Sequence, residues 1–207
     1  MNAEKIMKIF ADTAYVRVGG SDAELKAAEY LKQCCADMGL NAEIVPFEVP
    51  MAKMGKAVFE ADGAEIPCKG YLCAGSHEVE APLYYLTNTD SYSKSLVKGK
   101  IVLLESGLGY WTFRDLIENG AAGFITFDGN ANYADRDIDQ KELRSFVSKG
   151  DKLPGVNINA KDAIELVNKD VKNVKITLEQ EEYTGQSRNV ILDMPGEITE
   201  TVVFTAH

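Results

Sequence analysis

Two stretches near the start of the chain carry apolar residues at helical spacing. In residues 2–14, Ile6, Ile9 and Phe10 recur every three or four positions or adjoin, which predicts a short amphipathic helix. A second helix is predicted after residue 20. Its buried face is expected to comprise Leu25, Ala28, Leu31, Cys35 and Met38.

The second helix has recognisable start and stop signals. Ser21 followed by Glu24 predicts a capping box, in which the hydroxyl of Ser21 accepts the Glu24 N–H and the Glu24 carboxylate accepts the Ser21 N–H. Gly39 can adopt the left-handed conformation that ends a helix.

Short strands are predicted next. Residues 42–49 read as a strand that ends at Pro50, and Pro46 within it indicates an edge strand or a bulge. Asp62-Gly63 predicts a hairpin turn between residues 56–61 and 64–67, because such a turn needs positive φ. Further strands are expected at 71–74 and 83–86.

The middle of the chain predicts a βαβ unit. An apolar run at 101–104 leads into a helix at 110–119, and a second apolar run follows at 121–127. A strand at 153–158, a helix capped by Asn159 with Asp162, and a strand at 174–178 follow. The charge run 179–182 is expected to be a solvated strand end, and 185–188 a linker.

The last stretch predicts a strand from residue 189, a turn over Pro195-Gly196 and an apolar strand at 201–205. His207 follows directly. Loops beyond the carboxyl ends of strands form the binding crevice of α/β proteins, so His207 is a candidate metal ligand. The chain stops there, so the fragment alone is expected to be inactive.

These elements predict a mixed α/β fold in two parts. Residues 51–183 are expected to form one compact domain, and residues 1–50 with 184–207 two pieces of another, because domains are often inserted into loops of other domains.

Composition and charge narrow the function. The 207 residues carry a net charge of -10, with no cluster of Lys and Arg, which argues against nucleic acid and anionic membranes as partners. The N-terminus lacks the uninterrupted apolar core of a signal peptide, and no later run is long enough to span a membrane. A cytoplasmic protein is expected, with export after signal removal as the alternative.

Other candidate sites are weaker. The four cysteines include no Cys-x-x-Cys pair, although Cys68 and Cys73 could form a disulfide. His77 is expected to be an exposed loop residue rather than a ligand. The turn at 107–109 lacks the third glycine of a nucleotide fingerprint, and the acidic loop 128–150 does not complete a calcium pattern.

Three patches resemble the N-terminal part of a co-catalytic zinc aminopeptidase of the aminopeptidase Y and glutamate carboxypeptidase type, with an inserted protease-associated domain. They are residues 17–21 with the helix to residue 40, residues 97–104 with 119–125, and residues 187–191 with 195–196 and 202–207. The three patches occur in the same order and at a similar spacing as in the family, and together they span nearly the whole chain.

The resemblance implies a function for the parent protein. His207 corresponds to the first His of the family's His-x-Asp motif, so it would bind one of two zinc ions. Family members hydrolyse peptide bonds next to a free N-terminus, using a zinc-bound water and a glutamate as general base. The bridging Asp, the catalytic Glu and the other ligands are not in this sequence, and no zinc is expected to bind the fragment.

Two alternatives stay open at this stage. Residues 51–183 could be a stand-alone module that binds a protein or peptide without catalysis, or the βαβ unit could belong to a small nucleotide-binding protein. Because central strands of the peptidase sheet would be missing, residues 1–50 and 184–207 are expected to self-associate or to be poorly ordered.

Overall fold

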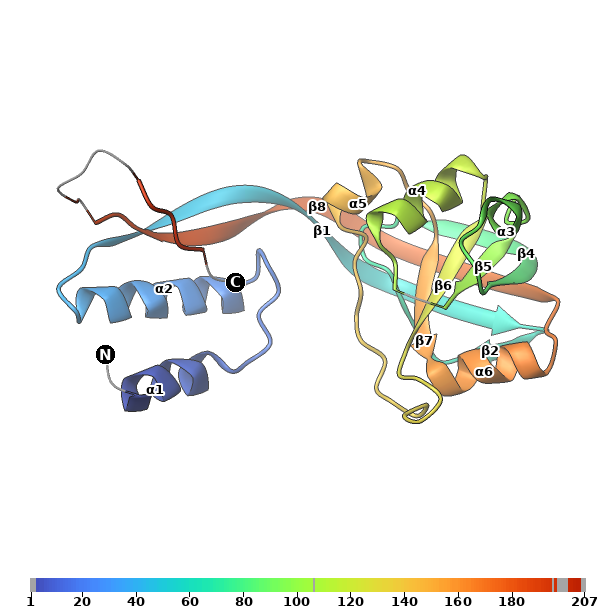
Figure 1. The fold of residues 1–207 in the computed structure, drawn as a ribbon, viewed down its shortest axis with the longest axis horizontal. Helices are drawn as coiled ribbons and strands as arrows, with labels where there is room; N and C mark the ends of the chain where they lie inside the picture. Colours follow the sequence, from blue (N-terminus) through green and yellow to red (C-terminus); the bar gives the residue numbers. More distant parts are fainter. Residues whose placement is uncertain (1–2, 106, 195, 197–200, 206–207) are drawn as a thin grey trace. The chain divides into compact units, whose positions relative to one another are not determined.

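The computed structural model describes residues 3–105, 107–194, 196 and 201–205. It confirms the mixed α/β fold (Figure 1). The helices are α1 (Ala3–Thr13), α2 (Asp22–Ala36), α3 (Ser91–Ser95), α4 (Tyr110–Glu118), α5 (Ser145–Ser148) and α6 (Ala160–Asn168). The strands are β1 (Ala42–Ala61), β2 (Ala64–Ile66), β3 (Cys68–Gly70), β4 (His77–Leu86), β5 (Ile101–Leu104), β6 (Gly123–Asp128), β7 (Gly155–Asn159) and β8 (Asn173–Leu192).

The chain divides into two compact units. Unit 1 comprises residues 1–49 and 184–207, and unit 2 comprises residues 50–183. Strand β1 crosses the boundary between residues 49 and 50, and strand β8 crosses the boundary between residues 183 and 184.

Unit 1 contains the two predicted N-terminal helices. Ser21 caps α2, with its Oγ accepting the Glu24 N–H at 3.2 Å, and Gly39 has a φ of 76° in the turn that follows the helix. The predicted buried face is only partly correct. Ala28 is buried, whereas Leu31 and Met38 are 37% and 44% exposed.

The strands β1 and β8 are longer than predicted. The sequence predicted that the first strand ends at Pro50 and that residues 185–188 are a linker, and both predictions are wrong because each strand continues for 20 residues. Proline is tolerated where its nitrogen faces an open strand edge. The hairpin partner β2 pairs only with Phe59–Ala61 of β1, which leaves the proline-containing part of β1 outside that pairing.

Unit 2 is built on a curved mixed sheet. The strand order is β2-β1-β8-β4-β5-β6-β7-β3, and β4 to β7 pair in parallel with their neighbours. The predicted βαβ unit is therefore confirmed as β5-α4-β6. Figure 1 shows α4 and α6 on opposite sides of the parallel strands.

Local predictions in unit 2 had mixed outcomes. The Asp62-Gly63 hairpin is confirmed, since both residues have positive φ (48° and 82°). The strand expected at 71–74 is wrong, because β3 ends at Gly70. His77 is half-buried and begins β4, where the sequence predicted an exposed loop residue.

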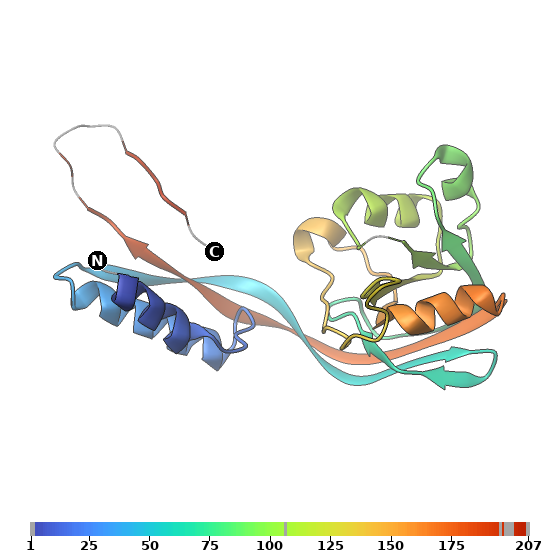
Figure 2. The same cartoon turned by 60° about the horizontal axis from the view of Figure 1, so that its bottom comes forward.

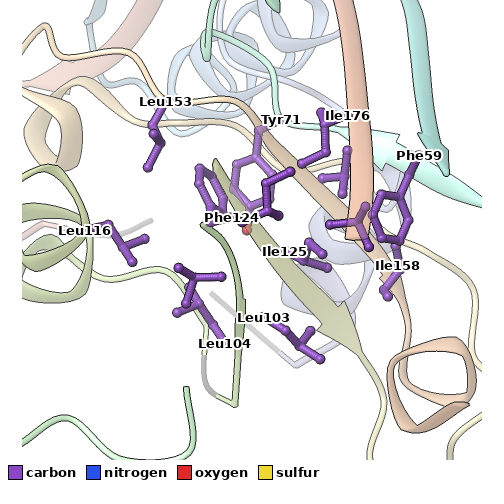
Figure 3. Close-up of a cluster of buried hydrophobic side chains, with 14 of the residues drawn as sticks. Phe59, Tyr71, Leu103, Leu104, Leu116, Phe124, Ile125, Leu153, Ile158 and Ile176 are labelled. Carbon is purple, nitrogen blue, oxygen red and sulfur yellow. The ribbon is translucent and has the colours of Figure 1, made fainter. Parts of the chain in front are cut away.

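The core of unit 2 lies between the parallel strands and the elements that cover them. Leu104 and Leu116 pack on the α4 side, and Phe124 makes an edge-to-face contact with Tyr71 at 4.8 Å between ring centroids (Figure 3). Gly155, aligned with Phe124 on the neighbouring strand, has no room for a side chain, because an added Cβ would lie 2.1 Å from the Phe124 ring. The core therefore depends on this aromatic-glycine pair.

The sheet curls so that its two ends approach each other. A Cβ added to Gly70 in β3 would lie 2.6 Å from Leu178 of β8 and 2.8 Å from Met54 of β1. Only glycine permits this close approach without displacement of its neighbours. The carboxyl ends of the parallel strands remain at one edge of this curled sheet.

Candidate functional site

The predicted metal ligand His207 lies outside the described residues. The described residues before it, 201–205, form no strand, so the strand predicted there is wrong. Val202, Val203 and Phe204 are 70%, 75% and 93% exposed. An apolar stretch forms a stable strand only when another strand supplies its backbone hydrogen bonds, and this dependence on a partner explains the failed prediction.

A cluster around Glu24 joins the two sequence segments of unit 1. The Glu24 carboxylate accepts the Gly20 N–H at 2.8 Å and a hydrogen bond from the Ser187 hydroxyl. Arg188 Nη1 lies 3.3 Å from Glu24 Oε2, with both side chains less than a fifth exposed. We call Glu24, Ser187 and Arg188 the Glu24 clamp. It ties the start of α2 to β8 across more than 160 residues of sequence.

The clamp differs from the predicted capping box in one bond. The carboxylate of Glu24 takes the N–H of Gly20 rather than that of Ser21. Burial alone would raise the pKa of Glu24, but the hydrogen bonds from Ser187, Gly20 and Arg188 and the charge of Arg188 outweigh it and lower the pKa. Glu24 is therefore held as a carboxylate.

Unit 1 also exposes large apolar side chains. They occur on α1, on α2, on the first part of β1 and on the last part of β8. The most exposed of them in these elements are Met7, Phe10, Phe47 and Ile191, each at 43% or more, and Met38 in the turn after α2 is 44% exposed. Apolar surface of this extent in one small unit is typical of a face that another element covers.

A buried polar chain links the strands of unit 2 to the long loop 129–144. Tyr71 and Thr126 share a hydrogen bond of 2.8 Å, Thr126 donates to Asn157 Oδ1 at 2.9 Å, and Asn157 Nδ2 donates to Asp128 Oδ2 at 2.6 Å. Lys141 completes it with an ion pair to Asp128 Oδ1 at 2.8 Å. Asn157 is fully buried, so the chain fixes the loop from inside.

Asp128 is held as an anion by this chain. Burial alone would raise its pKa, but hydrogen bonds from Lys141, from the backbone N–H of Asp139 and from Asn157 outweigh it and lower the pKa. The sequence prediction treated Asp128 as part of a solvated loop and did not single out Asn157. Polar residues inside otherwise apolar strands were the available signal.

Three hollows surround the loop 129–144 and the start of α6. Figure 2 shows the backbone of this loop beside α6. Their volumes are about 970, 390 and 400 Å³. They lie at the carboxyl ends of the parallel strands, where ligands of α/β proteins bind. Asn159, at the end of β7, caps α6 by accepting the Lys161 N–H at 2.8 Å and donates to the Arg136 carbonyl at 2.7 Å.

The other sequence candidates do not form a site in the described part of the chain. His77 Nε2 lies 3.0 Å from the Ala74 carbonyl oxygen. Cys68 and Cys73 are free thiols, so the disulfide considered from sequence is not formed. Among the described residues, no three His, Cys, Asp or Glu side chains are placed to hold a metal ion. These residues therefore do not by themselves supply a zinc site.

No helix within the described ranges is long and apolar enough to cross a membrane.

The fold matches solved peptidases. An aminopeptidase from Aneurinibacillus sp. strain AM-1 and a zinc aminopeptidase from Bacillus subtilis each align over 96% of this chain with a TM-score of 0.66 and 20% identity. The alignments cover 49% and 48% of those proteins. A peptidase M28 precursor from Shewanella amazonensis SB2B aligns over 90% of this chain and 48% of its own, with a TM-score of 0.59 and 17% identity.

The fold therefore places the chain among mixed α/β proteins. The chain shares this fold with zinc aminopeptidases and spans about half the length of the solved structures that it matches. No protein-family model matches the sequence, and no curated protein matches it by sequence.

Proposed function

We propose that this chain is the N-terminal part of a zinc-dependent aminopeptidase that hydrolyses N-terminal peptide bonds. The observation that carries the proposal is the alignment of 96% of the chain, both units included, with a solved zinc aminopeptidase. A match restricted to unit 2 would have supported only a binding module. The resemblance of residues 187–207 to the stretch before a first zinc ligand agrees with it.

In this proposal the two units have different roles. Unit 1 belongs to the peptidase domain, and residues 184–207 return into it towards His207. Unit 2 is a protease-associated domain that shapes substrate access or contacts other proteins. The whole enzyme would hold two zinc ions, which would supply an activated water and polarise the peptide carbonyl.

In this proposal, residues of unit 1 position the segment that leads to His207. The Glu24 clamp holds Ser187 and Arg188 of β8 against the start of α2. The chain leaves β8 after its last residue, Leu192, and reaches His207 fifteen residues later. Fixing β8 therefore restricts where that segment can reach, by the ordinary limits of chain length.

The proposal is tested by reading the frame beyond His207 and expressing the extended protein. We expect Asp at the second following position and hydrolysis of leucine p-nitroanilide that a chelator abolishes and zinc restores. His207→Ala should lower the zinc content measured by atomic absorption. The control is His77→Ala, at the only other histidine of the chain. A frame that stops at His207, or equal zinc content in both variants, would contradict the proposal.

We also propose that the 207-residue chain self-associates when expressed alone. Val202, Val203 and Phe204 are exposed apolar residues with strand-forming character. Unit 1 exposes further large apolar side chains, and such surfaces favour association. Sedimentation velocity should show dimers or larger species, and Val203→Lys should shift them towards monomer. A compact monomer at all concentrations would refute this expectation.

A further inference from the structure

The three hollows of unit 2 are parts of one groove. The largest and the third share Asp135 and Arg136, and the third and the second share Gly129 and Asn130. Because they share lining residues, the three hollows form a row of neighbouring depressions on the surface of unit 2. We call it the unit 2 groove, running along the loop 129–144 from Lys69 at one end to Glu105 at the other.

One end of the groove is apolar. Its floor is formed by Leu103 of β5 and Phe127 of β6, and its wall by α6, where Ile164 and Val167 are each 40% exposed. A volume of about 390 Å³ accommodates one large side chain with room at the rim. Exposed Ile and Val over a formed hollow favour an apolar group as occupant.

The rim of this apolar end carries a negative charge. Glu105 is exposed beside the hollow and accepts a hydrogen bond from the Tyr85 hydroxyl, which raises the pKa of Tyr85 to about 12. Among the described residues, no Lys or Arg forms an ion pair with Glu105. A cationic group on the occupant would complement this carboxylate.

The other end of the groove is wider and has charges of both signs. Lys69, Arg136 and Lys161 line it together with Asp135 and Asp137. A long, open depression with an apolar hollow at one end and mixed charges at the other suits an extended chain rather than a compact small molecule.

We propose that the unit 2 groove binds an extended polypeptide segment, with an apolar side chain in the hollow beneath Ile164 and an adjacent Lys or Arg at Glu105. The inference goes beyond the proposed peptidase activity. It concerns residues of unit 2 only and needs no zinc, so its failure and the failure of the enzyme proposal are separate results.

The test is fluorescence anisotropy with the 207-residue chain and short fluorescein-labelled peptides of glycine and serine. One peptide has a central Leu-Lys pair, and the matched peptides have Leu-Glu or Ser-Lys. We expect half-saturation below about 1 mM for Leu-Lys. Ile164→Glu should weaken this binding by at least about tenfold, because it places a charge in the apolar hollow.

Glu105→Gln should reduce the preference for Leu-Lys over Leu-Glu by about fivefold, the size of one exposed charge pair. The control is Tyr92→Glu, at an exposed side chain on α3 that does not line the groove. It should leave binding unchanged, and circular dichroism checks that each variant is folded. Absence of saturable Leu-Lys binding by the unaltered chain, or equal weakening by Ile164→Glu and Tyr92→Glu, would overturn the proposal.

Discussion

Removing the charge of Glu24 should loosen unit 1 selectively. Glu24→Gln keeps the shape of the side chain but leaves Arg188, which is only 16% exposed, without its carboxylate partner. Hydrogen bonds to charged groups contribute about 1.5–3 kcal/mol and neutral ones about 0.5–1.5 kcal/mol. With bonds from Gly20, Ser187 and Arg188 weakened together, we expect a loss of about 2 kcal/mol in the local stability of unit 1.

Hydrogen exchange followed by mass spectrometry measures this loss directly. A change of about 2 kcal/mol corresponds to roughly 30-fold faster exchange of amides in α2 and in residues 184–192. Amides in β5 and β6, which belong to unit 2, should exchange as before. The matched control is Glu29→Gln, at an exposed residue of the same helix.

The effect should depend on pH in a defined direction. Because the pKa of Glu24 is lowered on folding, its contribution is fully present above its unfolded pKa, about 4.3, and is lost as pH falls through the lower folded pKa. The exchange rates of the unaltered protein and of the Glu24→Gln variant should therefore differ at pH 7 and become equal in strong acid. Equal exchange in the Glu24→Gln and Glu29→Gln variants at pH 7 would refute the importance of the clamp.

Three further predictions concern unit 2. Gly155→Ala should lower the free energy of unfolding, measured in urea, by about 2 kcal/mol or more, because the new methyl group meets the Phe124 ring. Gly107→Ala is the control and should be nearly neutral, because the space around Gly107 is open. Equal effects of the two substitutions would contradict the close packing at Gly155. Asn157→Leu should cost about 2–3 kcal/mol and speed exchange in residues 128–141, since it leaves buried partners unsatisfied; unchanged exchange would argue against the polar chain. Asp128→Asn should lower the free energy of unfolding at pH 7 and change it less in acid, because the lowered pKa of Asp128 makes its contribution present at neutral pH. The measurement is the urea unfolding midpoint of both proteins at the two pH values, and an equal difference at both would contradict the prediction.

Elements with their own local signals were predictable from sequence. The Asp62-Gly63 turn, the Ser21 cap and the apolar run of β5 each follow from a few adjacent residues. Their physics is local, because turn conformation, capping and burial of a continuous apolar run involve neighbours in sequence.

The long strands were not predictable in this way. β1 contains Pro46 and Pro50, and β8 contains an acidic run and a glycine, all of which usually interrupt strands. Pairing of two extended segments with each other supplies the backbone hydrogen bonds that side chains do not signal. The extent of such a ribbon is decided by a partner far away in the sequence.

Most of the candidate sites also depend on distant partners. Nothing in the sequence near Glu24 indicates Ser187 and Arg188. The groove is assembled from β3, β4, β5, β6, β7, α6 and the loop between β6 and β7. The position of His207 after a predicted strand made it a candidate metal ligand, and the family resemblance alone suggested its role as a first zinc ligand. Its role as a zinc ligand stays a prediction.

The two boundaries of unit 2 lie on neighbouring strands. A Cβ added to Gly55 of β1 would lie 3.3 Å from the Glu179 carbonyl oxygen of β8, and the Asp62 N–H donates to the Asn173 carbonyl. The two neighbouring strands therefore run in opposite directions through unit 2. Deleting unit 2 therefore requires closing a gap of about one inter-strand spacing, near 5 Å, which a two-residue turn can span. Deletion of residues 50–183 with such a turn is therefore expected to leave a hairpin made of the remaining parts of β1 and β8.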